Sequence, residues 1–267
     1  MITRSTSIES LHGSTIITVE RLDKFLFEKG LAPSREKARA LIMAGLVKVD
    51  GRTVDKPGYR LKGSEKVDVL SPPRYVSRAG YKLEGALRDF GIDVRGKRVL
   101  DVGSSTGGFV DCLLQHGAVK VYGVDVGRGQ MDPKLRHDSR VVVHERTDAR
   151  KLTRKHVPED VDLITVDVSF ISLTKILPSV VGFLKKEGFL LALIKPQFEL
   201  SPKEVKKGVV RSRELQEKAI DKVVGCLRSL GFVPLGIKKA CIRGAKGNEE
   251  FFVLAKRGNY PSFACRP

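Results

Sequence analysis

The sequence predicts an α/β protein whose larger part is a mostly parallel, doubly wound sheet, preceded by a small α+β domain. From residue 98 onward, short apolar stretches alternate with amphipathic, helix-like stretches, as expected for strands that alternate with helices. A glycine-rich turn at 103–108 joins the first of these strands to a helix. A separate pattern of two short helices and a hairpin occupies residues 19–70. We therefore expect two domains.

The composition points to a polyanionic partner. The 267 residues include 49 Lys and Arg against 31 Asp and Glu, a net charge of +18, and 41% are hydrophobic. Such a balance favours nucleic acid over a membrane, the simplest alternative being a solvated basic surface. No stretch approaches the roughly 20 apolar residues of a membrane span, and residues 1–17 do not read as a signal peptide. The expected compartment is the cytoplasm.

The cysteines do not indicate a metal centre. The four cysteines lack the paired spacing of zinc ligands, and the five histidines do not cluster with them. Cys112 and Cys226 lie in apolar helical patterns, where a thiol behaves as a small hydrophobic side chain. We expect no metal.

The first domain is expected at 18–71, after a flexible extension at 1–17. Leu22, Phe25 and Leu26 share one face of a predicted helix, and Ser34 is a plausible N-cap of the next. Gly45 is expected to end that second helix. The Asp50–Gly51 pair predicts a tight hairpin turn, and a further strand follows at 66–70.

This domain resembles the S4 RNA-binding domain in three blocks. They are Arg21-Leu-Asp23, Ser34-Arg-x-x-Ala38 and Gly45-x-Val-x-Val-x-Gly51. In that family the second helix and its basic face contact RNA. The resemblance implies phosphate contacts for four basic residues, the alternative being a solvated helix face. These residues are Arg21, Arg35, Lys37 and Arg39.

A linker is expected at 72–80, the second domain at 81–258 and a tail at 259–267. Apolar stretches predict strands at 98–102, 120–126, 141–144, 161–166, 188–194, 234–240 and 250–255. Helices are expected near 108–116, 172–186 and 213–230, with an entry helix containing Tyr81, Leu83 and Leu87. The ending of a helix and two strands predicts a hairpin that carries an antiparallel edge strand.

The turn after the first strand favours a cationic ligand. Asp101-x-Gly-x-x-x-Gly107 is not a dinucleotide fingerprint, because its leading carboxylate would repel a pyrophosphate. That carboxylate suits an ammonium group, and S-adenosylmethionine (SAM) carries an ammonium and no phosphate. Asp125 and Asp148 follow the next two strands, where they could accept from the ribose hydroxyls and the adenine amine. Each could instead be a helix cap or turn residue.

The pattern strongly resembles motif I of SAM-dependent methyltransferases, which have a Rossmann-like fold with a seven-stranded sheet. The resemblance implies that SAM is the cofactor and that the residues around it come from the strand ends and the turn. The expected set is Asp101, Gly103, Ser104, Ser105, Thr106, Gly107, Asp125, Asp148 and Asp167.

Two charged residues end the fourth and fifth strands of this domain. Asp167 and Lys195 are expected to be neighbours, either as a salt bridge at the sheet rim or as functional groups facing the cleft. With Lys82 and Glu250 they form a Lys-Asp-Lys-Glu order that resembles the catalytic tetrad of FtsJ-type RNA ribose 2′-O-methyltransferases. Glu250 is preferred to Glu249 because the family motif reads Asn-x-Glu.

Residues 19–256 together resemble the TlyA family, also labelled hemolysin A, whose members methylate cytidines of 16S and/or 23S rRNA. The resemblance implies in-line methyl transfer to a ribose 2′-hydroxyl, with Lys195 as the base. Arg78, Arg211 and Arg213 are candidates to hold the RNA, unless they belong to ordinary exposed loops. The alternatives are a non-catalytic RNA-binding or ribosome-assembly factor and a membrane-lysing hemolysin. The sequence leaves the oligomeric state open, a monomer included.

Overall fold

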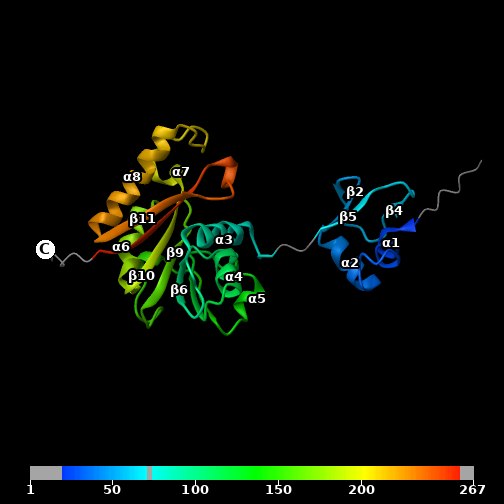
Figure 1. The fold of residues 1–267 in the computed structure, drawn as a ribbon, viewed down its shortest axis with the longest axis horizontal. Coiled ribbons are helices and arrows are strands. Elements are labelled where there is room, and N and C mark those ends of the chain that lie inside the picture. The colour runs from blue at the N-terminus through cyan, green and yellow to red at the C-terminus, as the bar shows by residue number, and fades with distance from the viewer. Residues whose placement is uncertain (1–19, 71–73, 259–267) are drawn as a thin grey trace, which may run out of the picture. The chain divides into compact units, whose positions relative to one another are not determined.

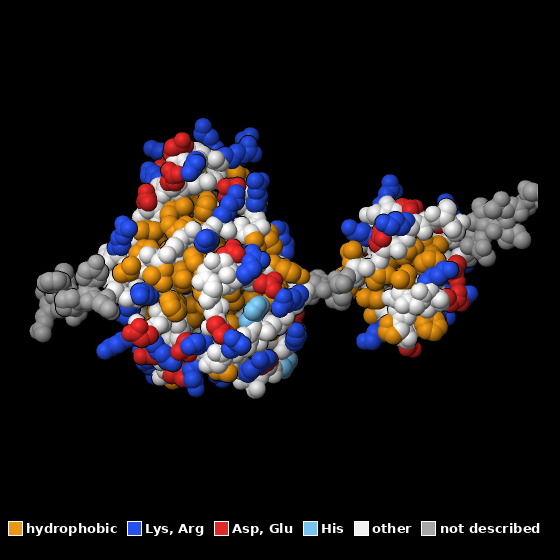
Figure 2. Space-filling model, viewed as in Figure 1, with side chains coloured by type: hydrophobic (Ala, Val, Ile, Leu, Met, Phe, Trp, Pro, Cys, Tyr) orange, Lys and Arg blue, Asp and Glu red, His pale blue; other side chains and the backbone are white. Residues whose placement is uncertain are grey.

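The computed structural model describes residues 20–70 and 74–258, and the chain divides into two units between Pro73 and Arg74 (Figure 1). The extension expected at 1–17, the tail expected at 259–267 and the Pro-Pro part of the linker lie outside the described residues. Lys and Arg side chains are spread over the visible face of each unit (Figure 2).

The first unit contains two short helices and two small antiparallel sheets. Strands β1 and β4 pair in one sheet, and the other has the order β3-β2-β5. The elements are β1 Glu20–Arg21, α1 Leu22–Glu28, α2 Arg35–Met43, β2 Val47–Val49, β3 Arg52–Thr53, β4 Arg60–Leu61 and β5 Val67–Val69.

Local sequence signals account for these boundaries. The Ser34 hydroxyl accepts a hydrogen bond from the Lys37 amide at 3.2 Å, which confirms the predicted N-cap. Asp50 and Gly51 both have positive φ, 48° and 76°, as a two-residue hairpin turn requires. The buried side chains of α1, α2 and β2 form one small core, which includes Leu22, Leu26 and Ile42.

The second unit is built around a seven-stranded sheet with the order β11-β12-β10-β9-β6-β7-β8. Strands β10, β9, β6, β7 and β8 are parallel to one another. The strands are β6 Arg98–Val102, β7 Lys120–Val124, β8 Val141–His144, β9 Val161–Val166, β10 Leu184–Ile194, β11 Phe232–Lys239 and β12 Phe251–Arg257.

Helices cover both faces of this sheet, so the prediction of a doubly wound fold is confirmed. Helices α3 and α4 lie over one face and α6 and α8 over the other (Figure 1). Each face has its own apolar core. The strands are apolar throughout, so their side chains pack against helices on both sides of the sheet. The helices are α3 Arg78–Phe90, α4 Gly108–Gln115, α5 Pro133–Arg136, α6 Leu177–Val180, α7 Pro196–Glu199 and α8 Arg213–Ser229.

The predicted C-terminal hairpin with an antiparallel edge strand is confirmed. Strand β12 is antiparallel to both neighbours and lies between β10 and β11, so the edge strand is β11. The strand after the last turn therefore inserts next to β10 and pairs Phe251 with Ile194. This placement brings residue 250 beside the end of β10.

Two predicted boundaries are wrong. The single helix expected at 172–186 is three short pieces, Leu173–Lys175, α6 and Val181–Phe183. Pro178 lacks the amide hydrogen that a continuous helix would need there, and β10 already begins at Leu184. Helix α3 begins at Arg78, inside the expected linker 72–80, after an extended Ser77.

Candidate active site

The carboxyl ends of β6, β7 and β9 surround a cavity of about 500 Å³, whose lining includes Asp125, Asp148 and Asp167. A smaller cavity of about 180 Å³ adjoins it and includes Lys195. The two cavities share Gly103, Ser105, Asp167 and Ser169. They therefore form one cleft at the edge where open α/β sheets bind ligands.

Two positions of the glycine turn, Gly103 and Gly107, have no room for a side chain. Gly103 has φ of +86°, and a Cβ there would lie 2.4 Å from the carbonyl oxygen of Asp167. Gly107 has φ of +93°, and its Cβ would lie 2.4 Å from a methyl of Leu135. The turn is therefore packed against β9 on one side and α5 on the other.

Asp125 is fixed at the end of β7 by two backbone amides. Its carboxylate accepts from Ser105 N at 2.8 Å and from Gly127 N at 2.7 Å. The first bond joins the end of β7 to the glycine turn after β6. A carboxylate bound in this way is oriented while its remaining lone pairs stay available to a ligand in the cavity.

Asp148 serves as a cap as well as lining the cavity. It accepts from Arg150 N at 2.9 Å and forms an ion pair with the Arg150 guanidinium at 2.6 Å. The hydrogen bonds from Arg150 lower the pKa of Asp148 to about 2. Asp148 therefore stays ionised at neutral pH.

The prediction that Asp101 meets the ligand is corrected by the structure. Its side chain is 0% exposed and lines neither cavity. Oδ1 accepts from Thr165 Oγ1 of the paired strand at 2.6 Å, whereas Oδ2 has no hydrogen-bond partner among the described residues. Burial is the main reason that its pKa is raised to about 7, with smaller contributions from the charges of Asp167 and Asp125.

Two ion pairs contain the four residues of the predicted tetrad. Lys195 Nζ lies 2.6 Å from Asp167 Oδ1, and Lys82 Nζ lies 2.6 Å from Glu250 Oε2. All four side chains are at most 14% exposed. Lys195 also donates to the hydroxyl of Ser169 at 2.9 Å. Both lysines are thus oriented by an anionic partner in poorly solvated surroundings.

Strand register brings the two pairs to the same end of the sheet. Val166 of β9 pairs with Ala192 of β10, and Ile194 of β10 pairs with Phe251 of β12. Asp167 follows β9, Lys195 follows β10 and Glu250 precedes β12, so all three lie at the same edge of the sheet. Glu250 has its carboxylate toward Lys82 of α3, whereas Glu249 contacts Lys239, so the preferred glutamate is the buried one.

Sequence reasoning missed Gly244, which makes room for Glu250. An ideal Cβ on Gly244 would lie 1.8 Å from Glu250 Oε1. The carboxylate therefore packs directly over the backbone of the hairpin loop. A single glycine in a loop gives no signal of this kind in the sequence, because the contact depends on the paired strands.

The loop after β9 was also missed. Phe170 is 91% exposed, lines the larger cavity and has φ of +63°, a conformation that costs energy for a residue with a side chain. Glu199 of α7 is 4% exposed and holds the same loop, because it accepts from Ser172 Oγ at 2.5 Å and from Leu173 N at 2.7 Å. An aromatic residue three positions after Asp167 was the available signal.

The RNA candidates lie in both units. In the first, Asp23 is buried and pairs with Arg21 at 3.0 Å and Arg35 at 3.3 Å, which joins these arginines. Lys37 and Arg39 are exposed on α2.

In the second unit, Arg78 donates to the carbonyl of Arg243 at 3.4 Å. Arg211 and Arg213 line a different cavity, between α8 and the β11–β12 hairpin.

Comparison with known proteins decides the family. The family model described as FtsJ-like methyltransferase matches residues 75–257, and the S4 domain model matches residues 20–67. This chain belongs to the FtsJ-like methyltransferase family and carries an S4 domain. The predicted fold class, a Rossmann-like methyltransferase sheet after a small S4 domain, is confirmed.

Several relatives cover most of the chain. It is 42% identical to the 16S/23S rRNA (cytidine-2′-O)-methyltransferase TlyA of Mycobacterium tuberculosis, over 87% of this chain and 88% of the relative. It is also 42% identical to Hemolysin A of Brachyspira hyodysenteriae, over 86% of this chain and 97% of the relative. A solved structure named as a hemolysin of Streptococcus thermophilus is 37% identical, with a TM-score of 0.70, over 92% of this chain and 90% of that one.

The family implies use of SAM, and the donor set of this cleft fits that cofactor. Its lining contains three carboxylates, from Asp125, Asp148 and Asp167, against the cations Arg150 and Lys195. Those two cations are already paired with Asp148 and Asp167. A pyrophosphate would meet uncompensated negative charge, whereas a sulfonium and an ammonium would meet acceptors. No group of His, Cys, Asp and Glu in the described residues could hold a metal ion.

Proposed function

We propose that this protein is a SAM-dependent rRNA methyltransferase that acts on the ribose 2′-hydroxyl of cytidine. The observation that carries the proposal is the pair of lysine–carboxylate contacts at one edge of the cleft, Lys195–Asp167 and Lys82–Glu250. The relatives named rRNA (cytidine-2′-O)-methyltransferase, at 41–42% identity, support the choice of rRNA and of cytidine. Both 16S and 23S rRNA are candidate substrates.

The larger cavity is the proposed adenosine site. Asp125 is oriented to accept from the ribose hydroxyls of SAM, and Asp148 from the adenine amine. The turn at 103–107 and the smaller cavity would hold the methionine part. When bound, SAM supplies an electrophilic methyl group on a positively charged sulfur. Asp101 would act through Thr165 and the turn, without touching the ligand.

The smaller cavity is the proposed site of the acceptor hydroxyl. Lys195 lines it and is held by Asp167 and Ser169, so Nζ is the group positioned to bond the 2′-oxygen. In its neutral amine form, after giving one proton to solvent, Nζ would take the hydroxyl proton as the new O–CH₃ bond forms and the S–CH₃ bond breaks. Lys82 and Glu250 form the adjoining pair, which would fix the ribose by hydrogen bonds. Holding the hydroxyl in line with the methyl group would contribute as much as proton transfer.

Basic residues of both units would bind the RNA. Arg21 and Arg35 are joined by Asp23, with Lys37 and Arg39 on the same helix as Arg35. We propose that this part of the S4 domain contacts phosphates and that the cleft receives the target nucleotide. An rRNA substrate would place the protein in the cytoplasm.

One relative is named Hemolysin A, which makes membrane lysis a second candidate. No helix in the described part of the chain is long and apolar enough to cross a membrane. Leakage of a dye from liposomes on addition of the purified full chain would support this alternative.

The test is transfer of labelled methyl from SAM to rRNA by the full chain. The acceptors are 16S transcript, 23S transcript and the two purified ribosomal subunits, and the product is digested to nucleosides. The proposal expects 2′-O-methylcytidine. Label on a base, or no label on any RNA acceptor, would reject it, the latter favouring a non-catalytic RNA-binding factor.

A further inference from the structure

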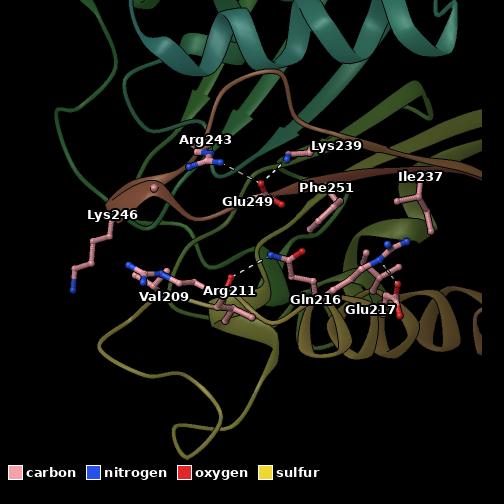
Figure 3. A pocket seen from close by; sticks show the side chains of 14 residues that line it. Val209, Arg211, Gln216, Glu217, Ile237, Lys239, Arg243, Lys246, Glu249 and Phe251 are labelled. Carbon is pink, nitrogen blue, oxygen red and sulfur yellow. Dashed lines mark hydrogen bonds and ion pairs between the residues drawn. The ribbon is translucent and has the colours of Figure 1, made fainter.

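The two lysine–carboxylate pairs, Lys195–Asp167 and Lys82–Glu250, make up the ion-paired site. A groove of about 780 Å³ lies beside it, between the start of α8 and the β11–β12 hairpin (Figure 3). Lys239, Arg243 and Glu249 come from the hairpin, and Gln216 and Glu217 face them from α8 (Figure 3). The groove is separate from the cleft at the glycine turn, since none of its lining residues belongs to either cavity there.

Buried polar side chains fix the wall that leads into α8. Asn248 is 2% exposed and spans the two walls, because its Oδ1 accepts from Val210 N at 3.0 Å and its Nδ2 donates to Gly208 O at 2.9 Å. Gln216 is also buried and donates to Val210 O at 3.2 Å. The backbone before Arg211 is therefore held in place, which makes the groove a preformed feature of the fold.

The groove carries a net positive charge. Five cationic and two anionic side chains line it. Glu249 is neutralised by Lys239 at 2.5 Å and Arg243 at 3.5 Å, and the hydrogen bond from Lys239 lowers its pKa. Arg211 and Lys246 have no ion-pair partner within residues 20–70 and 74–258. These two exposed cations are thus available to an anionic ligand.

The position and the apolar lining of the groove indicate what kind of anion it fits. Phe251 lines it and directly follows Glu250, so the groove begins next to the ion-paired site. Ile220, Ile237 and Phe251 give it apolar surface between the charged side chains. A cationic groove with apolar and aromatic surface is the arrangement that binds a single nucleic-acid strand, with phosphates on the cations and bases or riboses on the apolar part.

We propose that this groove binds the single-stranded RNA segment next to the target nucleotide, with Arg211 and Lys246 on its phosphates. The proposal rests on the proposed function, which makes RNA the substrate. It adds the path that the RNA segment takes over the protein surface. An acidic peptide would use the same charges, but it has no need of a groove that begins at the ion-paired site. RNA that leaves the acceptor site must pass along the surface beside it.

The test compares charge removal inside and outside the groove in the full chain. Arg211→Ala/Lys246→Ala removes two unpaired groove cations, and Lys175→Ala/Arg228→Ala removes two exposed cations elsewhere on the second unit. The probe is a fluorescein-labelled single-stranded RNA of about 16 nucleotides, near the upper footprint of one single-strand binding module. Binding is measured by anisotropy across a series of salt concentrations.

The groove variant is expected to weaken binding roughly 15-fold at about 0.15 M salt and to lower the slope of log K against log salt by about 1.4, since each phosphate contact on a single strand contributes about 0.7. The control variant should keep the wild-type slope. Glu217→Gln should strengthen binding, because it removes an anion that pairs with Arg213 at 3.0 Å. SAM affinity, measured as a check on folding, should not change.

An unchanged slope in the groove variant, or an equal loss in the control variant, would overturn the inference. Methyl transfer to 16S and 23S rRNA is followed in parallel, and the groove variant should raise KM for RNA with kcat within about twofold. If the wild-type chain transfers no methyl to RNA while the salt slope still falls in the groove variant, the proposed function fails and the groove remains an RNA site.

Discussion

Lys195 Nζ and Asp167 Oδ1 lie 2.6 Å apart at the ends of the adjacent parallel strands β10 and β9. Their contact lies where the proposed adenosine cavity meets the smaller cavity, which would hold the methionine part and the acceptor hydroxyl, because Asp167 lines both. Glu250 is held by Lys82 in the neighbouring pair and lines neither cavity. The two carboxylates should therefore differ in what their removal affects.

Asp167→Asn is expected to weaken SAM binding and to reduce transfer, whereas Glu250→Gln should reduce transfer with SAM affinity within about twofold. Each change removes the charge that holds one lysine, so the loss in transfer rate should not exceed the roughly 10²–10⁴-fold that proton transfer itself contributes. Isothermal titration with SAM and single-turnover transfer separate the two effects. Equal losses of SAM affinity in both variants would contradict this assignment.

Gly244→Ala should reduce methyl transfer while leaving SAM affinity intact. The added Cβ would occupy a position 1.8 Å from Glu250 Oε1, so the carboxylate must leave Lys82 or the hairpin loop must shift. Gly225→Ala is the matched control, because nothing lies within 4 Å of its Cβ position in α8. The control should keep full activity and gain about 0.5–1 kcal/mol of stability. A fully active Gly244→Ala enzyme would show that the close contact is unimportant.

Glu199→Ala should lower both stability and activity, because Glu199 holds the loop that carries Ser169 and Phe170. It accepts hydrogen bonds from Ser172 Oγ and Leu173 N, and lies 3.5 Å from Lys222 Nζ. Losing these contacts should cost about 2–4 kcal/mol in urea unfolding. Glu199→Gln retains an acceptor and should recover part of kcat. If Glu199→Ala loses stability without any effect on kcat, the residue is only structural.

Asp101→Asn should change how stability depends on pH. Burial raises the pKa of Asp101 to about 7, so the folded protein keeps a proton that the unfolded chain loses near pH 4. The contribution of Asp101 to wild-type stability therefore falls as pH rises from about 4 to about 7. The asparagine variant lacks that loss, so its unfolding free energy relative to wild type should rise over the same range. Parallel pH profiles of the two proteins in urea unfolding would contradict the assignment.

The sequence alone was sufficient for the features that depend on local pattern. The apolar runs predicted the parallel strands, and the order of Asp125 and Asp148 after successive strands predicted two carboxylates that line the cleft. The Asp50–Gly51 turn and the Ser34 cap were equally local, and the structure confirms both. Lys195 was singled out because an ammonium at the end of a long apolar strand is costly without a partner.

The features that the sequence did not predict depend on contacts between distant segments. No local pattern indicates that β12 lies between β10 and β11, and that insertion creates the contact of Gly244 with Glu250. Asp101 lies inside β6 in register with Gly123, two positions before the level of Asp125, so its side chain meets Thr165 of β9 inside the sheet. The groove combines cations from two segments that only the hairpin brings together.

The proposed chemistry is tested most directly by single-turnover methyl transfer from labelled SAM to rRNA with Lys195→Ala. Lys175→Ala, an exposed lysine of the same unit, is the matched control. We expect Lys195→Ala to bind SAM within about twofold of wild type and to lose at least about 100-fold in transfer rate, the lower range for a proton-transfer group. The control should transfer normally. A Lys195→Ala enzyme that methylates rRNA at the wild-type rate would contradict the assignment of this site.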